Sequence, residues 1–203
     1  MKHILTVVAF LMVSVFAQAK GNVAIGSFEI LDKEWFIVSL SQPDAAGMAI
    51  PRAGTRLELK AIADDISPRR FRQLWRDALA VSESGDIWHD FSTDFETFFD
   101  VVQAPLLNGD HLVLEQSDNS VIVSVNHYEH ARLSNSFLGM VLKTLTARIA
   151  PIPELKQGLL AQLPETEQKR LSSAFATGDV SLQRISETAR WLRIPKSSGV
   201  SQL

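Results

Sequence analysis

The middle of the chain carries the clearest pattern of apolar and polar positions. Apolar residues dominate 111–115 and 121–125 with polar residues interspersed, and the polar residues 117–120 separate the two runs. A strand with this pattern places one side on the core and the other in water, so the pattern predicts an antiparallel hairpin. Apolar positions then recur at helical spacing over 136–149, and the hairpin is expected to lead into a helix.

Three earlier strands are expected over 25–31, 35–40 and 56–62. Each run is rich in β-branched, aromatic or alternating apolar residues, and polar turn residues separate them. Together with the hairpin they indicate a domain built from an antiparallel sheet and helices.

Ser67 and Pro68 mark the start of the helix that the pattern defines best. Serine is a favoured N-cap, and proline at the first helical position loses no hydrogen bond. The apolar residues that follow recur along one face of this helix: Phe71, Leu74, Trp75, Ala78 and Leu79. The arginines between them are balanced by nearby acids and are interpreted as a solvated face rather than as a phosphate-binding patch.

A second, shorter helix, which Ser92 or Thr93 would cap, carries an aromatic stripe. Its apolar positions again recur at helical spacing: Phe95, Phe98, Phe99 and Val102. Such stripes usually pack into a core, but three phenylalanines this close could also line an apolar pocket. The sequence leaves both interpretations open.

Prolines divide the last third of the chain into short helices. Asn135 or Ser134 would cap the helix that Pro151 ends, and Pro153 opens another that runs to residue 163. Residues 164–203 then form a C-terminal extension of two helices and a polar tail. Four apolar residues of the second helix are expected to dock on the body, with Trp191 beside them: Leu182, Ile185, Ala189 and Leu192.

Residues 1–19 have the pattern of a secretory signal peptide. Lys2 precedes an apolar run over 4–16, and Ala17-Gln18-Ala19 supplies the small residues of a cleavage site. The alternative is an N-terminal membrane anchor, but about 13 apolar residues fall short of the roughly 20 that a spanning helix needs. We therefore expect cleavage after Ala19, no stable membrane insertion of the mature chain, and a periplasmic location.

The composition fits one globular domain and excludes several kinds of chemistry. The 203 residues are 46% hydrophobic and include no cysteine, so the fold rests on its core without disulfides. The missing cysteine also excludes a cysteine nucleophile and an iron–sulfur site. A formal net charge of −3, which becomes −4 once Lys2 is removed, offers no basic surface for nucleic acid.

His127 and His130, with Glu129 between them, lie in a polar segment after the hairpin. Histidines three residues apart could bind a metal from a helical turn, but no third ligand stands at a diagnostic spacing. The segment is therefore interpreted as a surface loop with ordinary histidines. No phosphate-binding loop, dinucleotide fingerprint or serine nucleophile motif occurs, so neither a metal nor a cofactor is predicted.

Four short stretches, in this order of elements, resemble the chalcone isomerase-like family and more closely its secreted bacterial members. They are Leu57-Glu58-Leu59, Phe71-Arg72-Gln73-Leu74-Trp75-Arg76-Asp77-Ala78, Asn108-Gly109-Asp110 and Pro153-Glu154-Leu155-Lys156-Gln157-Gly158-Leu159-Leu160. The likeness extends over residues 23–163, so residues 20–163 are expected to form a chalcone isomerase-like domain. It implies an α+β fold, an open-faced β-sandwich in which an antiparallel sheet packs against a layer of helices with a cleft between them.

The resemblance places the catalytic positions of the plant isomerases on residues that are unsuited to this chemistry. The family's strand arginine falls near Ile25, and its helix tyrosine and asparagine fall on Phe71 and Ala78. None of these side chains can donate a hydrogen bond to a developing enolate or phenolate. We therefore predict no catalytic residue.

Other members of the family resemble fatty-acid binders that hold an acyl chain in the same cleft, which implies a similar role here. Six apolar residues would line that cleft: Phe71, Trp75, Phe98, Phe99, Phe137 and Val141. Tyr128 or Arg132, just after the hairpin, could meet the carboxylate of the ligand. The alternative is that these aromatic side chains pack on one another and fill a closed core.

Three functions are compatible with the sequence. The first is a non-catalytic periplasmic protein that binds a fatty acid or a similar apolar ligand. The second is an isomerase or lyase that uses other residues, such as Tyr128, His127 or Glu129. The third is a protein-interaction module of the cell envelope, in which the C-terminal extension binds a partner.

Overall fold

The structure is a computed structural model that describes residues 22–43, 51–80 and 86–193. The predicted signal peptide, residues 1–19, lies outside these ranges. None of the helices within them has both the length and the apolar character that crossing a bilayer requires.

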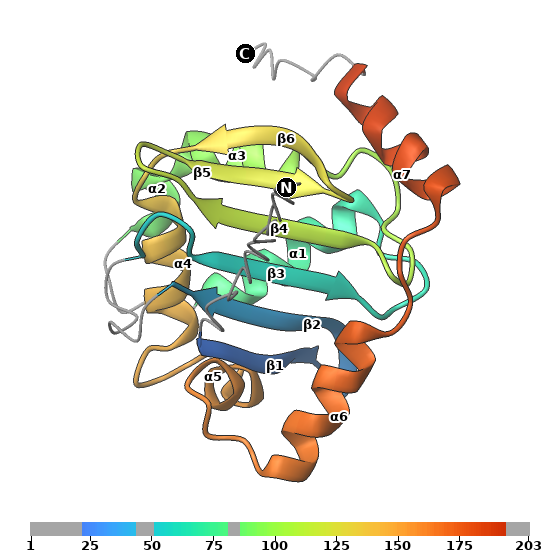
Figure 1. The fold of residues 1–203 in the computed structure, drawn as a ribbon. Coiled ribbons are helices and arrows are strands. Elements are labelled where there is room, and N and C mark those ends of the chain that lie inside the picture. Colours follow the sequence, from blue (N-terminus) through green and yellow to red (C-terminus); the bar gives the residue numbers. More distant parts are fainter. Residues whose placement is uncertain (1–21, 44–50, 81–85, 194–203) are drawn as a thin grey trace, which may run out of the picture.

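Six antiparallel strands form one sheet, in which the spatial order follows the order along the chain (Figure 1). The strands are Asn22–Ile30 (β1), Lys33–Gln42 (β2), Arg56–Ala61 (β3), His111–Gln116 (β4), Val121–Val125 (β5) and Tyr128–Leu133 (β6). The predicted hairpin corresponds to β4 and β5, and the three earlier predicted strands correspond to β1, β2 and β3. With helices packed on this sheet, the predicted α+β fold is confirmed.

Strand β6 corrects the sequence analysis, which interpreted the segment around His127 as a surface loop. Asn126 and His127 have positive φ angles of 47° and 75°, and they connect Val125 and Tyr128, which are paired across β5 and β6. Two-residue turns with positive φ match the twist of a hairpin, and asparagine tolerates this conformation. The chain therefore reverses at once, and His130 lies buried within β6.

Seven α-helices lie in the described residues. They are Pro68–Leu79 (α1), Ile87–Asp90 (α2), Ser92–Phe99 (α3), Phe137–Leu145 (α4), Pro153–Leu159 (α5), Glu165–Ala176 (α6) and Leu182–Ala189 (α7), and the 3₁₀ helix Arg190–Arg193 follows α7. Helices α1, α3, α4 and α5 contribute to the main core with one face of the sheet. Helix α6 instead packs Leu171 on Ile25 and Ile37, which belong to the other face. Figure 1 shows α1 and α3 behind the sheet and α6 beside its β1 edge.

Helix ends agree with the sequence at one place and differ at others. Ser67 caps α1 as predicted, because its hydroxyl accepts a hydrogen bond from a backbone N–H of the first turn at 3.2 Å. The predicted cap of α3 is wrong, since α2 leads directly into it and Ser92 is already helical. Neither predicted cap serves α4, since Ser134 donates to Asp94 and Asn135 accepts from Gln116 instead.

Helix α7 and the 3₁₀ helix after it dock through only some of the side chains expected. Leu182 and Leu192 are 84% and 49% exposed, so the expected docking is wrong for both leucines. Trp191 packs in the main core as expected, and Ile185 and Ala189 are half-buried. Thr188 is fully buried, and polar contacts add to the docking of this part of the extension.

Asp110, just before β4, is the centre of these polar contacts. The residue is 2% exposed, and its carboxylate accepts hydrogen bonds from the Asn126 amide and the Leu107 backbone N–H, both at 2.8 Å. The Arg184 guanidinium of α7 donates to the same carboxylate at 2.6 to 3.1 Å. Asn126 also donates to Thr188 of α7 at 3.2 Å. One buried carboxylate thus joins the approach to β4, the β5–β6 turn and α7.

Helix α5 lies against β1 at a distance that only glycine permits. A Cβ atom at Gly158 would lie 2.3 Å from the Cα of Gly26 and 2.4 Å from the carbonyl oxygen of Ile25. Both neighbours are backbone atoms, which cannot move aside without shifting the helix or the strand. The pair of glycines therefore sets how closely α5 covers this edge of the core.

We expect Gly158→Ala to lower the free energy of unfolding by about 3 kcal/mol or more, because overpacking must separate α5 from β1. Urea denaturation followed by circular dichroism measures the loss. Gly139→Ala is the matched control, since it also puts alanine in a helix but its Cβ lies 3.2 Å from a proline ring atom. The control should stay within about 1 kcal/mol of the parent protein. Equal effects of both changes would contradict the close approach.

We expect Arg184→Met to lower the free energy of unfolding by about 3 kcal/mol, because the Asp110 carboxylate loses its cation while remaining buried. The control is Arg190→Met, which removes an exposed arginine that donates only to the backbone carbonyl of Ser186. This control should cost less than about 0.5 kcal/mol. Denaturation curves that coincide for the two variants would show that Asp110 does not hold α7.

Candidate functional site

The aromatic residues that were predicted to line a cleft pack on one another. Phe71, Phe98, Phe137 and Val141 are fully buried, and Trp75 is 1% exposed. Ring centroids lie 5.1 Å apart for Trp75 and Phe98, and 5.4 Å apart for Phe71 and Phe98. These are the separations of packed aromatic pairs. Side chains therefore fill the space between sheet and helices here, as the closed-core alternative describes.

Arg132 and Tyr128, which were predicted to meet a carboxylate, lie away from this aromatic core. Arg132 stands between the buried Ala131 and Leu133 on β6, so its side chain points away from the helices. Its guanidinium donates to both carboxylate oxygens of Glu129, at 2.6 and 2.9 Å. Tyr128 is 46% exposed. The structure does not bring these two residues to the predicted cleft.

The positions that correspond to the catalytic residues of the plant isomerases are buried and apolar. Phe71 and Ala78 lie fully buried on α1, and Ile25 packs beneath α6 on the other face of the sheet. His130 lies against the ring of Trp191, with ring centroids 6.3 Å apart. Across the described ranges, no three or more side chains of the metal-ligating types gather around one point.

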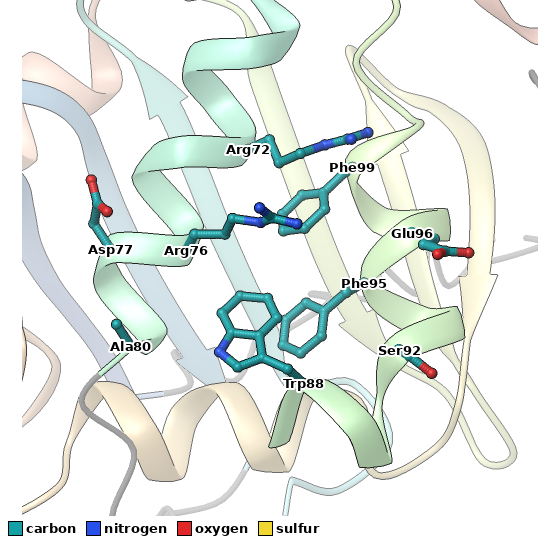
Figure 2. Close-up of a pocket in the computed structure, with 9 residues that line it drawn as sticks. All are labelled: Arg72, Arg76, Asp77, Ala80, Trp88, Ser92, Phe95, Glu96 and Phe99. Atoms are coloured by element: carbon teal, nitrogen blue, oxygen red, sulfur yellow. The ribbon is translucent and has the colours of Figure 1, made fainter. Parts of the chain in front are cut away.

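A groove of about 600 Å³ lies between α1 on one side and α2 and α3 on the other. Figure 2 shows its residues: Arg72, Arg76, Asp77, Ala80, Trp88, Ser92, Phe95, Glu96 and Phe99. Three aromatic side chains form its apolar part. The ring centroids of Trp88 and Phe95 lie 4.2 Å apart, and those of Phe95 and Phe99 lie 5.9 Å apart. Of the eight predicted ligand-binding residues, Phe99 is the one that lines this groove.

Two arginines of α1 reach across the groove towards α3 (Figure 2). The Arg72 guanidinium lies 5.4 Å from the centre of the Phe99 ring and 3.5 Å from a carboxylate oxygen of Asp100. Arg76 has no hydrogen bond or ion pair within the part of the chain that the structure describes. The acids beside them are turned outwards, because Asp77 and Glu96 point away from the groove. The groove therefore presents positive charge above an aromatic wall.

The sequence analysis interpreted Arg72 and Arg76 as part of a solvated face and did not name Trp88. The two arginines directly follow Phe71 and Trp75 of the buried stripe, so they lie on the flank of α1 that faces α3. Trp88 belongs to the four-residue helix α2, which the sequence analysis did not predict. Arginines that stand one position after apolar residues of the stripe were a signal in the sequence. The sequence did not show which helix lies opposite them.

Another cavity, of about 480 Å³, lies away from the groove at the end of α6. The buried ammonium of Lys60 donates there to two backbone carbonyls at the C-terminus of α6, both at 2.7 Å. His111 lies 3.1 Å from the Glu58 carboxylate. Burial raises the pKa of Glu58, but the hydrogen bond from His111 and the charge of Arg56 outweigh it and lower the pKa. Lys60 therefore holds the C-terminus of α6, while His111 and Glu58 pair between the neighbouring strands β4 and β3.

The comparisons with known proteins identify the fold. No protein-family model and no curated protein matches the sequence. The structure resembles the crystal structure of a fatty-acid binding protein of Arabidopsis thaliana, with a TM-score of 0.50 and 9% sequence identity. The match covers 77% of this chain and 88% of that chain. The Arabidopsis protein has a chalcone isomerase-like fold, so the two chains share the fold that the resemblance in sequence implied. At this identity, the match shows the fold alone.

The structure separates core aromatic residues from groove aromatic residues, and stability measurements test this division. Phe98→Ala should lower the free energy of unfolding by about 3–5 kcal/mol, because it opens a cavity in the core. Trp88→Ala, at a half-buried position of the groove, should cost about 1 kcal/mol. Urea denaturation of both variants makes the comparison. A cost for Phe98→Ala no larger than that for Trp88→Ala would contradict the division.

Proposed function

We propose that the protein is a non-catalytic binder of a fatty acid or a similar amphipathic anion, and that it acts in the periplasm. The observation that carries the proposal is the groove beside α1, where Trp88 and Phe95 form an apolar wall below Arg72 and Arg76. The shared fold with a fatty-acid binding protein supports the same class of ligand. The signal-peptide pattern of residues 1–19 supports the location.

The size and chemistry of the groove suit such a ligand. Its volume of about 600 Å³ lies within the range of roughly 300–1,000 Å³ that is typical of small-molecule sites. The aromatic wall offers an acyl chain a surface that excludes water. Arginine binds a carboxylate through two parallel hydrogen bonds. Arg76 would lose no hydrogen bond to the described residues when it binds one.

The arrangement favours binding over catalysis. Ile25, Phe71 and Ala78 are apolar and buried where the plant isomerases carry polar groups. Of the residues named for the alternative enzyme, Glu129 is engaged with Arg132 and Tyr128 is exposed on an outer strand. The interaction-module alternative rests on the C-terminal extension, whose buried residues are occupied by contacts with the domain itself, such as Arg184 with Asp110.

We expect palmitate to bind the purified protein and Arg76→Gln to weaken that binding about tenfold, because one charge-assisted hydrogen-bond pair is lost. Isothermal titration calorimetry measures the affinity. Lys143→Gln is the control, since it removes the same charge from an exposed position of α4 outside the groove. Trp88→Ala should also weaken binding, because it removes the apolar wall.

Native mass spectrometry of the protein from producing cells provides an independent measurement. It should show a bound lipid on a chain that begins at Lys20, as cleavage after Ala19 requires. The proposed function would be contradicted if the protein carries no lipid and calorimetry detects no heat of binding with palmitate. Equal weakening by Arg76→Gln and Lys143→Gln would place the ligand elsewhere.

A further inference from the structure

A second hollow, of about 330 Å³, adjoins the groove at Phe99, between α1 and the end of α3. It is lined by Pro68, Arg69, Arg72, Phe99, Asp100, Val102 and Gln103. The two hollows share Arg72 and Phe99, so they lie end to end along the line where α1 faces α3. We call this combined surface the α1–α3 seam.

The two ends of the seam differ in chemistry. The end near Ala80 carries Trp88 and Phe95, whose rings lie 4.2 Å apart. The end near Pro68 carries two arginines, a carboxylate and the Gln103 amide. A ligand that fills the seam therefore has a long apolar part and a strongly polar head.

Three arginines of α1 line the seam at successive turns of one helix face. Arg69, Arg72 and Arg76 are spaced by three and four residues, so they span about 10 Å along the helix axis. Arg69 and Arg76 have no hydrogen bond or ion pair within the described residues, and Arg72 meets Asp100 at 3.5 Å. Arg70, on the same helix, points elsewhere and stacks on Trp35 at 4.4 Å. Three of the arginines on this solvated face thus line the seam, while the fourth packs against Trp35.

We propose that the seam binds a lipid phosphomonoester, with the phosphate among Arg69, Arg72 and Arg76 and the chain along Trp88 and Phe95. This inference rests on the proposed function and adds the chemistry of the head group. A carboxylate carries one charge and satisfies one guanidinium. A phosphomonoester carries about −1.5 to −2 charges near neutral pH and three acceptor oxygens, which match several guanidinium groups at once.

The test compares two ligands with the same chain, palmitate and palmitoyl lysophosphatidic acid, below their micelle-forming concentrations. Near neutral pH, the phosphomonoester should bind about tenfold more tightly or better, because it meets at least one more arginine. Arg69→Gln should remove most of this preference and change palmitate affinity less than about twofold, because Arg69 lies beyond the first hollow. Arg70→Gln is the matched control and should leave the preference intact.

Acidity gives a second readout. The second phosphate proton has a pKa of about 6, so the preference should shrink as the pH is lowered from about 7 to about 5.5, a range in which a carboxylate stays mostly ionised and palmitate binding changes little. Palmitate binding without a preference for the phosphomonoester would overturn this inference and leave the proposed function standing. A preference that Arg69→Gln does not reduce would also overturn it. Failure of both lipids to bind would overturn the proposed function together with the inference.

Discussion

The packing of Phe71 and Trp75 of α1 against Phe98 of α3 is the contact on which the rest of the structure depends. The three rings lie within 6.3 Å of one another by their centroids and close the space between the sheet and the helices. This contact gives the domain its core without disulfides, and it leaves no room between the two layers for a ligand at this point. It also fixes the distance between α1 and α3, and with it the seam on their outer side.

Most of the architecture could be predicted from the sequence because each of the strands β1 to β5 has its own local pattern. The hairpin of β4 and β5 and the start of α1 at Ser67 follow from alternation and capping alone. Strand β6 was missed because its only local signal is the Asn126-His127 turn, where both residues adopt positive φ. The predicted cap of α4 at Ser134 was wrong because a partner distant in sequence, Asp94, binds its side chain. Contacts of that kind have no period along the chain.

The site was harder to predict than the fold, for a geometric reason. Phe95, Phe98 and Phe99 have equivalent positions in a helical pattern, yet Phe98 is fully buried while Phe95 and Phe99 reach the groove. The difference depends on where α1 and α2 lie relative to α3, which a periodic pattern does not contain. The same holds for Arg72 and Arg76. Their positions next to the apolar stripe indicate a groove only when the position of α3 opposite them is known.

Charged groups elsewhere in the described structure differ from the arginines of the seam in that they bind partners within the fold. Glu34 is held by Arg170 of α6, whose hydrogen bond lowers the pKa of the carboxyl, and Lys60 holds the carbonyls at the end of the same helix. Asp110 does the same for α7 through Arg184. In each case a charge secures the C-terminal extension on the sheet. Arg69 and Arg76 are exposed and have no such hydrogen bond or ion pair in the described residues. Their guanidinium groups are therefore available to an anion, which is the physical basis of the proposed binding at the seam.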